Sequence, residues 1–431
     1  MYNDLKQFFK KAGTPLAIFD DIVKNISEII KFDSSQSAPA PDAPFGLGAK
    51  KALDYFLALA ERLGFEIKNY DGYAGEVIFG RGEEFAVLAH LDVVPAGGGW
   101  TKQPFGGEID YTLGRIWGRG AIDDKGPAII ALFAMKALKD EGFVPNRKIK
   151  LIVGCNEENG WECIEYYKAH AHMPEEGISP DADFPVIYAE KGILQLKLKF
   201  KAKGDFSALK GGERANMVCD MCEAAENGKD PALYGVERVN GKIISHGKSA
   251  HGSTPEKGVN AIPPVLSYLG LDEIRSLLFN DGFGLLKLKD ETGALTFSPN
   301  VISGGKGEIK VVCDVRYPAT MPRESVLSLI DARGVKYEIL HEQAPLFNDK
   351  NCFLIKTLCG VYNEVTGRNC EPLAIGGGTY ARALKCGAAF GPEEEGEENT
   401  VHQANEYITF EKIEKCFKIY KLALERLTSA K

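Results

Sequence analysis

Predicted strands alternate with predicted helices through the first 190 residues, and this alternation constrains the fold more than any other feature of the chain. Residues 49–64 and 126–142 have the apolar periodicity of amphipathic helices, and each ends in glycine. Apolar runs at 66–80, 84–92 and 148–158 predict strands, the last two buried. Because the helices are long enough to connect parallel strands, we expect an α/β fold, with a sheet covered by helices on both faces.

The pattern changes near residue 194. Residues 193–204 and 308–318 alternate apolar and polar side chains, as half-exposed antiparallel strands do. Long amphipathic helices return towards the C-terminus, and residues 1–32 also carry helical periodicity. The predicted domains are a first α/β part at 1–193, an inserted α+β domain at 194–345, and a second part of the α/β domain at 346–431.

Composition narrows the class of protein. The chain has 431 residues, 44% of them hydrophobic, which is enough for a large core. It carries 52 Lys and Arg against 60 Asp and Glu, a net charge of -8. We therefore expect no nucleic-acid or membrane partner, since either would favour a concentrated basic surface, and a small molecule is the favoured ligand. No stretch approaches the roughly 20 apolar residues of a membrane span.

The N-terminus and the cysteines predict a cytoplasmic protein. The first 21 residues mix acids with lysines and contain no apolar core of a secretory signal. The ten cysteines are scattered, and the CxxC pair Cys219 and Cys222 has no second pair with which to form a zinc ribbon. We expect reduced thiols, mostly in the core. The acidic run at 393–398 is expected to be a solvated loop, with an ion or partner site as the alternative.

Side chains that bind metals stand where predicted strands end. His90 and Asp92 are two apart in an extended segment, so they face the same way, and the carboxylate could hold the imidazole in one tautomer. Glu157 and Glu158 follow another buried strand, where adjacent carboxylates repel unless a cation or a shared proton neutralises them. The glutamate pair favours a functional site. Alone, His90 and Asp92 are better explained as a structural histidine and a turn aspartate.

Three further residues have ordinary structural explanations when each is considered alone. Asp123 precedes a helix together with Asp124, and paired acids there commonly cap the helix and compensate its dipole. Asp181 stands in a Pro-Asp turn ahead of a strand, and His402 is a single histidine in a loop. A functional role for these three residues can therefore be judged only together with the other candidate ligands.

Taken together, these residues match the requirements of a site for two divalent cations. Such a site needs one carboxylate shared by both ions, a histidine and a further carboxylate for each ion, and a bridging water. The possible ligands are Asp123 as the bridge, His90 and Asp181 for one ion, and Glu158 and His402 for the other. Glu157 remains as a general base. A His/Asp/Glu set without cysteine suits zinc, with manganese or cobalt as alternatives.

Five motifs in this order identify a resemblance. They are HLDVVPAGGGW (90–100), GRGAIDDKGP (118–127), NEENGW (156–161), SPDADFPVIYAEKG (179–192) and HQANEY (402–407). The sequence resembles the two-zinc metallopeptidase family that includes carboxypeptidase G, aminoacylase, carnosinase and succinyl-diaminopimelate desuccinylase, and within it the bacterial PepV-type dipeptidases. The resemblance covers nearly the whole chain. It implies a two-zinc exopeptidase-like catalytic domain, a mixed sheet flanked by helices, with an inserted α+β lid domain.

The resemblance also implies roles for the residues of the first domain. Asp92 would clamp the ligand His90. The other matches are Asp123 as the bridging ligand, followed by a cis peptide bond, Glu157 as the general base, and Glu158, Asp181 and His402 as ligands.

In the inserted domain the resemblance implies contacts with the substrate. His251 matches a histidine that stabilises the tetrahedral oxyanion, the backbone at Asn216 matches a second oxyanion contact, and Arg316 matches an arginine that binds the substrate carboxylate. Gly376, Gly377 and Gly378 match a loop beside the substrate. By pattern alone, His251 is an ordinary loop histidine and Arg316 a surface charge at a strand edge.

The predicted function is metal-dependent hydrolysis of unblocked dipeptides by a hydroxide that bridges the metals, with Glu157 as general base. An N-acyl amino acid amidohydrolase, either a deacetylase or a desuccinylase, would use the same site and is the alternative. A non-catalytic metal-dependent peptide-binding protein is a third possibility, although it would have no need of Glu157. Because the insertion is longer than the lid of dimeric family members, we expect a monomer.

Overall fold

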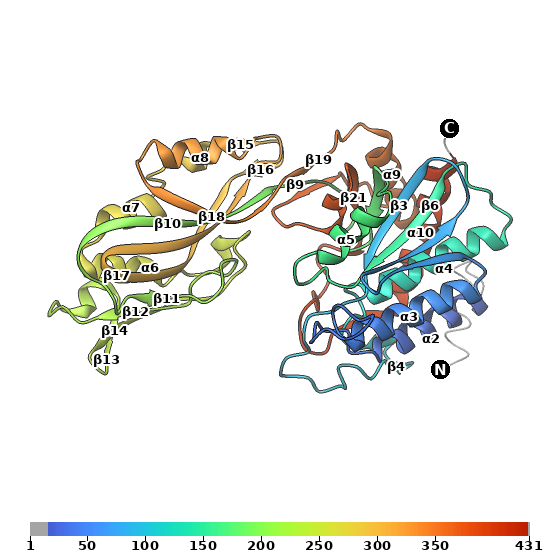
Figure 1. The fold of residues 1–431 in the computed structure, drawn as a ribbon, viewed down its shortest axis with the longest axis horizontal. Helices are drawn as coiled ribbons and strands as arrows, with labels where there is room; N and C mark the ends of the chain where they lie inside the picture. Colours follow the sequence, from blue (N-terminus) through green and yellow to red (C-terminus); the bar gives the residue numbers. More distant parts are fainter. Residues whose placement is uncertain (1–15, 430–431) are drawn as a thin grey trace. The chain divides into compact units, whose positions relative to one another are not determined.

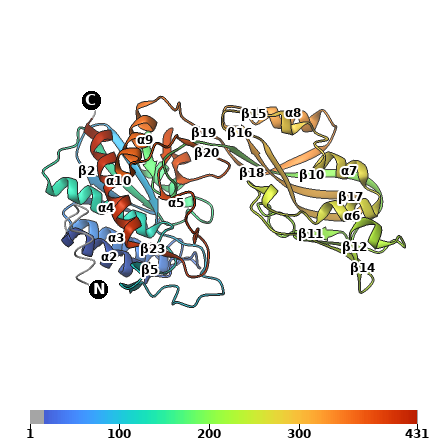
Figure 2. The ribbon, with the colours of Figure 1, turned by 180° about the vertical axis from the view of Figure 1, so that it is seen from behind.

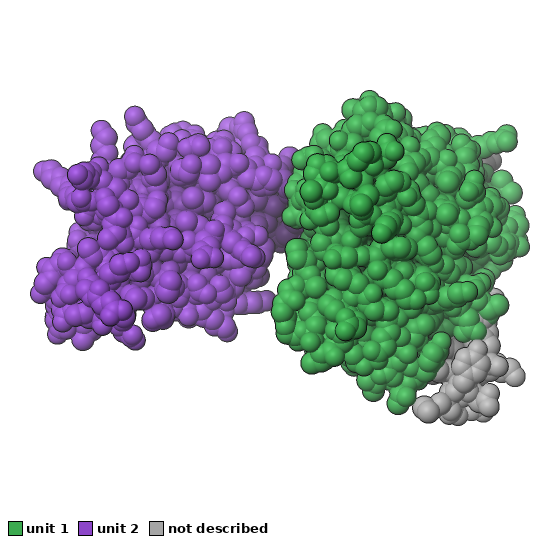
Figure 3. Space-filling view, turned by 60° about the horizontal axis from the view of Figure 1, so that its bottom comes forward, with its two compact units in different colours: residues 1–188, 348–373, 379–431 green, residues 189–347, 374–378 purple. Residues whose placement is uncertain are grey.

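The computed structural model describes residues 16–429, which divide into two compact units. Unit 1 consists of the described residues up to Tyr188, of Asn348–Leu373, and of the described residues from Thr379 onwards, whereas unit 2 consists of Ala189–Phe347 and Ala374–Gly378 (Figure 3). Unit 2 is thus slightly longer at both ends than the predicted insertion at 194–345. It also includes residues 374–378, which were predicted to belong to the second part of the α/β domain.

Unit 1 is an α/β unit whose elements come from both ends of the chain (Figure 1). Up to the insertion they are α2 (Leu16–Ile30), α3 (Leu47–Arg62), β1 (Glu66–Tyr70), β2 (Ala74–Phe79), β3 (Glu84–His90), β4 (Glu108–Asp110), β5 (Arg115–Trp117), α4 (Lys125–Asp140), β6 (Lys148–Gly154), α5 (Glu162–His170), β7 (Glu176–Ser179), β8 (Ala182–Asp183) and β9 (Ile187–Glu190). After it come α9 (Phe353–Thr366), β20 (Leu373–Ile375), the 3₁₀ helix η4 (Tyr380–Ala383), β21 (Cys386–Ala389), β22 (Pro392–Glu393), β23 (Tyr407–Thr409) and α10 (Phe410–Ser429). The chain passes between the two units within β9 and within β20, and β19 (Leu346–Phe347), which pairs with β9, belongs to unit 2. Residues 1–15, part of the predicted N-terminal helical segment, lie outside the described residues.

The central sheet of unit 1 is mixed. Among the described residues its strand order is β1-β2-β6-β3-β7-β21-β9-β19, with β20 beside β9. The inner strands β6, β3, β7 and β21 run parallel to their neighbours in that group, and β1, β2 and β9 pair antiparallel. β3 and β6 are buried along almost their whole length, which explains their continuous apolar sequences. The predicted mixed sheet is confirmed.

Helices cover both faces of this sheet. α5 lies in front of it in Figure 1, and α4 and α10 lie in front of it in the opposite view of Figure 2. α10 packs along α4 and α9. The helices differ in burial as their positions require: α4 is buried over most of its surface, whereas α3 and α10 each keep one exposed face.

Unit 2 is an α+β unit with its own core. Its elements are β10 (Gly192–Asp205), β11 (Lys210–Gly211), β12 (Met221–Ala225), η1 (Pro231–Tyr234), β13 (Glu237–Val239), β14 (Lys242–His246), η2 (Pro255–Lys257), α6 (Ile262–Leu269), α7 (Asp272–Phe279), η3 (Leu285–Lys287), β15 (Lys289–Asp290), β16 (Gly293–Ala294), β17 (Thr296–Tyr317), α8 (Glu324–Asp331) and β18 (Lys336–Gln343). The main sheet has the order β13-β14-β12-β11-β17-β10-β18 and is antiparallel.

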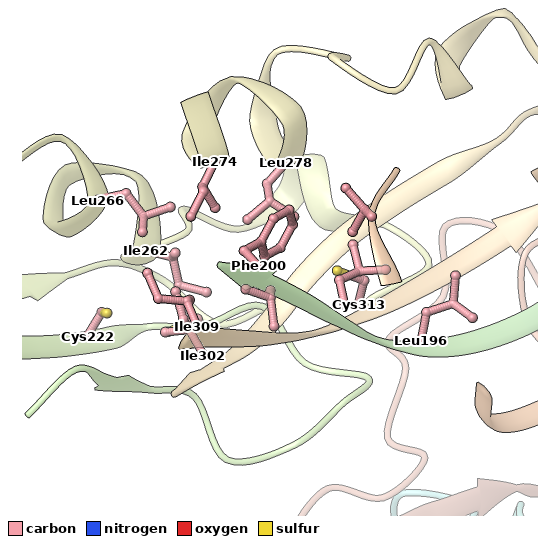
Figure 4. Close-up of a cluster of buried hydrophobic side chains, with 14 of the residues drawn as sticks. Leu196, Phe200, Cys222, Ile262, Leu266, Ile274, Leu278, Ile302, Ile309 and Cys313 are labelled. Atoms are coloured by element: carbon pink, nitrogen blue, oxygen red, sulfur yellow. The ribbon is translucent and has the colours of Figure 1, made fainter. Parts of the chain in front are cut away.

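The core of unit 2 lies between this sheet and its helices. β10 alternates buried and more exposed residues, as its sequence predicts. Leu266, Ile274 and Leu278 from α6 and α7 face Phe200 and Ile309 from the sheet (Figure 4). Because this cluster is formed within the insertion, the sequence change near residue 194 marks a separately packed unit.

The acidic run at 393–398 is not simply a solvated loop. Glu393 and Glu394 are buried, at 8% and 6% exposure, and their carboxylates pair with Lys412 and Lys415 of α10 at 3.1 and 2.7 Å. The remaining residues of the run are exposed. The expectation was therefore wrong for the first two glutamates, because the lysines that neutralise them are distant in sequence.

Candidate active site

Three neighbouring parallel strands bring the candidate ligands to one edge of the unit 1 sheet. β3 lies between β6 and β7 and runs parallel to both. β3 ends at His90, Glu157 follows the end of β6, and Asp181 follows the end of β7. Carboxyl ends of parallel strands lie at a common edge, where ligand sites of open α/β sheets form. The topology therefore converts three separate motifs into one cluster.

Asp123 joins the cluster from the turn before α4. The Gly126 N–H donates to the carbonyl of Gly120 at 3.2 Å, which closes the turn. A Cβ atom on Gly126 would lie 2.0 Å from the carbonyl oxygen of Ala121, so the turn requires glycine there. The peptide bond between Asp123 and Asp124 is cis, as the family resemblance implied.

The carboxylate of Asp123 lies between two imidazoles. Its Oδ1 is 3.0 Å from Nε2 of His90, and its Oδ2 is 2.9 Å from Nε2 of His402. On the outer sides, Asp181 Oδ2 lies 3.6 Å from Nε2 of His90, and Glu158 Oε1 lies 2.9 Å from Nε2 of His402. One oxygen of Asp123 thus faces each histidine–carboxylate pair, the arrangement expected of a bridging ligand.

Asp92 contacts both His90 and the glutamate pair. The Nδ1 atom of His90 is 3.0 Å from the carbonyl oxygen of Asp92 and 3.6 Å from its carboxylate. The carboxylate instead accepts hydrogen bonds from the backbone N–H groups of Glu157 and Glu158, at 3.0 and 3.1 Å. With Nδ1–H directed to the carbonyl, Nε2 keeps its lone pair for a ligand. Asp92 therefore orients both the histidine and the glutamate pair.

Burial and crowded charge set the protonation of the cluster. Burial lowers the pKa of His90, but the carboxylates of Asp123 and Asp181 outweigh it and raise that pKa well above its usual value. Burial likewise opposes the charged form of His402, yet hydrogen bonds to Asp123 and Glu158 raise its pKa to about 10. Burial also raises the pKa of Glu158, and the nearby Asp123 charge adds to the effect.

The cluster fits a metal ion. Nε2 of His90 is buried and has no hydrogen-bond partner of acceptable geometry, although two carboxylates face it. Among the described residues, two groups that share His90 could hold a cation: His90 with Glu157 and Asp181, or His90 with Asp123 and Glu158. Ligand atoms within each group lie within 4.8 Å of one another. Imidazole and carboxylate donors suit zinc and similar divalent ions, and a cation would relieve the repulsion among the carboxylates.

Glu157 lies beside the cluster with a hydrogen-bond donor of its own. The indole Nε1–H of Trp161 donates to its Oε1 at 3.1 Å. Trp161 has a left-handed backbone conformation, with φ 68°, and its ring meets the ring of buried Tyr380 edge-on. Burial raises the pKa of Glu157 well above its usual value, although the positive charge of His90 opposes this. A carboxylate with a raised pKa is suited to taking up a proton.

Sequence reasoning missed two buried acids that position the ligands. Asp124 accepts the backbone N–H of His90 at 3.1 Å through Oδ2. Glu406 accepts the N–H groups of Ile122 and Asp123 at 3.0 and 3.4 Å and pairs with Arg119 at 2.7 Å. Asp124 stands in the motif GRGAIDDKGP, next to the ligand Asp123, and Glu406 stands in HQANEY, four residues after His402. Their proximity to the ligands was the available signal.

The predicted substrate contacts in unit 2 form a second group. Arg316 is 5% exposed in β17 and is not a surface charge. Its Nη2–H donates to Asp314 Oδ2 at 3.0 Å and its Nη1–H to the carbonyl of Gly376 at 3.0 Å. The bond to Gly376 links β17 to the loop of Gly376, Gly377 and Gly378, and further guanidinium N–H groups remain for a carboxylate.

Asn216 and His251 meet in the same unit. The carbonyl of Asn216 accepts the N–H of Gly252 at 2.7 Å, and Met217 forms a β-bridge with His251. The structure thus brings together the ligand set within unit 1 and, separately, the predicted substrate contacts within unit 2.

This fold and site define a class: α/β proteins with a histidine–carboxylate cluster that could hold a metal ion and with an inserted α+β unit. The model of peptidase family M20/M25/M40 matches residues 86–426, and the chain belongs to this family. Members of the family depend on metal ions. The chain is 33% identical to the Beta-Ala-Xaa dipeptidase of Lactobacillus delbrueckii subsp. lactis, over 95% of this chain and 96% of that protein.

Solved structures share the fold. Human carnosine dipeptidase 1 matches with a TM-score of 0.57 at 14% identity, covering 96% of this chain and 97% of that one. The dipeptidase Dug1p from Saccharomyces cerevisiae matches with a TM-score of 0.58 at 15% identity, covering 96% and 98%. The predicted family is confirmed. Within the described residues, no helix is both long and apolar enough to cross a membrane.

Proposed function

We propose that the protein hydrolyses the peptide bond of unblocked dipeptides, with two divalent zinc ions as its cofactors. The observation that carries this proposal is the position of the Asp123 carboxylate between His90 and His402, with Glu157 beside them. The name of the Lactobacillus relative, a Beta-Ala-Xaa dipeptidase, supports the substrate class.

The chain offers a ligand set for each ion. His90, Asp123 and Asp181 would hold one, and Asp123, Glu158 and His402 the other. When bound, such ions supply positive charge that polarises a carbonyl and lowers the pKa of a water molecule. Manganese or cobalt would suit the same donors.

Glu157 is the proposed general base. Its carboxylate would take a proton from the attacking water and later deliver it to the leaving amine. Trp161 holds one carboxylate oxygen and so leaves the other for the proton. The buried surroundings favour the protonated form of Glu157 between these two transfers.

Unit 2 is proposed to act as a lid that recognises the substrate. His251 would donate a hydrogen bond to the oxyanion that forms at the attacked carbonyl, with the backbone at Asn216 as a second contact. Arg316 would bind the free carboxylate through its remaining guanidinium N–H groups, and the loop of Gly376, Gly377 and Gly378 would lie beside the substrate. Recognition of the free amine near the metal ions and of the carboxylate by unit 2 would restrict the length of the peptide.

An N-acyl amino acid amidohydrolase is the second candidate, because the same metal ligands and base would cleave an amide of that kind. The two candidates differ at the substrate amine, which is free in a dipeptide and acylated in the alternative. A peptide-binding protein without catalysis is the third, and the presence of a positioned Glu157 argues against it.

The test is hydrolysis of a panel of substrates by metal-free, zinc-loaded and manganese-loaded protein. The panel contains free dipeptides, including β-alanyl ones, beside N-acetyl and N-succinyl amino acids. We expect cleavage of the dipeptides only, and only with metal. Glu157→Ala should lower kcat at least about 100-fold while zinc binding, measured by calorimetry, is retained. Glu162→Ala, which changes an exposed acid in the same segment, is the control and should keep full activity.

Each other outcome has a definite meaning. Preference for acylated amino acids would replace the dipeptidase proposal by the amidohydrolase. Zinc binding without any cleavage would favour the binding protein. An active Glu157→Ala variant would remove Glu157 from the mechanism.

We further propose that the protein acts as a monomer in the cytoplasm. All ten cysteines are free thiols in the structure, which suits a reducing compartment. Light scattering on the zinc-loaded protein tests the first proposal, because a dimer would double the 47.1 kDa mass of the chain. Fractionation of cells tests the second.

A further inference from the structure

The imidazole of His251 makes hydrogen bonds through its Nδ1 atom. Its Nδ1 atom lies 2.7 Å from the hydroxyl oxygen of Ser253 and receives the backbone N–H of the same serine at 3.2 Å. Within residues 16–429, the structure gives Nε2 of His251 no hydrogen-bond partner. One residue therefore provides both hydrogen bonds to this ring.

These two bonds determine which ring nitrogen carries the proton. A backbone N–H can only donate, so Nδ1 of His251 must present its lone pair to Ser253. The serine hydroxyl, which can donate or accept, then has to donate to the same atom. Because Nδ1 accepts both hydrogen bonds, a neutral imidazole carries its single proton on Nε2. In a doubly protonated ring, the Nδ1–H group would point at the backbone N–H of Ser253 and be repelled.

We propose that Ser253 is a positioning residue for His251: its hydroxyl and its backbone N–H fix the neutral ring with the proton on Nε2, directed outward as a hydrogen-bond donor. The inference rests on the proposed function, in which this Nε2–H group meets the oxyanion. A ring with the opposite tautomer would present a lone pair to that oxyanion and repel it.

The surroundings of His251 favour the same state. The charged groups that influence it are Arg316 and Asp314, both from β17. Burial lowers the pKa of His251, the positive charge of Arg316 lowers it further, and Asp314 opposes them. Burial and Arg316 therefore favour the neutral ring, which the hydrogen bonds at Nδ1 also require.

The glycine loop leaves room for the serine. A Cβ atom on Gly376 would lie 3.2 Å from Cβ of Ser253, closer than most side-chain contacts. The same Gly376 accepts a hydrogen bond from Arg316. Ser253 is thus packed between the histidine that it orients and the loop that anchors the arginine.

The tautomer can be measured directly by nitrogen-15 NMR of the full-length, zinc-loaded protein labelled at its seven histidines. A His251→Asn variant identifies the resonances of this ring by their loss. We expect an unprotonated Nδ1 and a protonated Nε2 in the wild type. In Ser253→Ala, the Nδ1 resonance should shift towards the value of a partly protonated nitrogen, because the ring would then populate both tautomers. A protonated Nδ1 in the wild type would overturn the proposal.

Kinetics supply the second readout. Ser253→Ala should lower kcat about tenfold with little change in KM, because the oxyanion contact acts in the transition state. Ser253→Thr keeps a hydroxyl and should restore both kcat and the NMR pattern. The control is Ser249→Ala, which removes a nearby hydroxyl that donates to the carbonyl of Val218 at 3.3 Å. This control should match the wild type.

Two results separate this inference from the proposed function. If Ser253→Ala keeps both the wild-type tautomer and the wild-type kcat, the positioning role is wrong although the dipeptidase stands. If the wild type cleaves no dipeptide, the proposed function fails, and the tautomer measured in the wild type and in Ser253→Ala still decides whether Ser253 orients His251.

Discussion

Substitution of Asp92 by asparagine tests whether its carboxylate positions the candidate metal ligands. The Asp92 side chain is 1% exposed, and its two carboxylate oxygens accept the backbone N–H groups of Glu157 and Glu158 at 3.0 and 3.1 Å. Asparagine has nearly the same shape but offers one oxygen and one NH₂ group. Its NH₂ must then face one of the two backbone N–H groups.

The expected cost follows from these contacts. Loss of one hydrogen bond to a charged acceptor costs about 1.5–3 kcal/mol, and leaving a buried N–H without a partner adds about 1–3 kcal/mol. Removing one negative charge from a crowded acidic cluster relieves repulsion and offsets part of this. We therefore expect the free energy of unfolding of the metal-free protein to fall by about 2 kcal/mol. Zinc affinity should fall about 10- to 100-fold, because the ligands His90 and Glu158 lose their orientation.

Urea unfolding followed by circular dichroism measures the first quantity, and titration calorimetry with zinc measures the second. Asp110→Asn is the matched control. The Asp110 carboxylate also accepts two backbone N–H groups, those of Thr112 and Leu113 at 2.9 Å each, but these bonds are exposed to solvent. Asp110→Asn should lower the free energy of unfolding less than Asp92→Asn does, and it should leave the zinc affinity unchanged. If Asp92→Asn unfolds like the wild type and binds zinc equally well, the positioning argument is refuted.

Two further predictions concern stability. Zinc should raise the melting temperature of the metal-free protein in a concentration-dependent way, because it binds only the folded ligand set; scanning calorimetry would contradict this if the chelated and loaded proteins melted together. Hydrogen bonds from His172, Lys150 and Lys148 outweigh burial and lower the pKa of Glu84 from 4.5 to about 2. A carboxyl group whose pKa is lowered by folding stabilises the folded state at pH values above its pKa in the unfolded chain. This contribution is lost as the pH falls through the pKa of the folded state. Because solvent screens this partly exposed carboxylate, Glu84→Gln should cost only about 1 kcal/mol at pH 7 and should flatten the decline in stability between about pH 4.5 and 2. Urea unfolding at several pH values that showed an unchanged decline would contradict this.

The fold class was accessible from the sequence because it depends on local periodicity. Continuous apolar runs such as 84–92 predict buried strands, and alternation at 193–204 predicts a half-exposed one. The exact limits of the inserted unit were not accessible. They depend on residues 374–378, which join unit 2 through contacts such as that of the Gly376 carbonyl with Arg316.

The residues of the candidate site were also visible as motifs, whereas their partners were not. The acids near His90 could be named, but the sequence could not show that the Asp92 carboxylate binds the glutamate backbone and leaves the imidazole to a carbonyl. Likewise, the sequence predicted that Glu393 is exposed to solvent, whereas in the structure it pairs with Lys412. Pairings between distant segments carry no local signal.

The sequence by itself determined which side chains this protein has for chemistry and which segments form its strands and helices. Both follow from residue type and from periodicity, which are local properties. The tertiary structure decided how these side chains meet: the parallel order β6-β3-β7 gathers the ligands at one edge, and the bridge between β17 and the glycine loop holds Arg316. The physical reason is that burial, charge pairing and hydrogen-bond direction are properties of groups in contact, and contacts between distant segments exist only after the chain has folded.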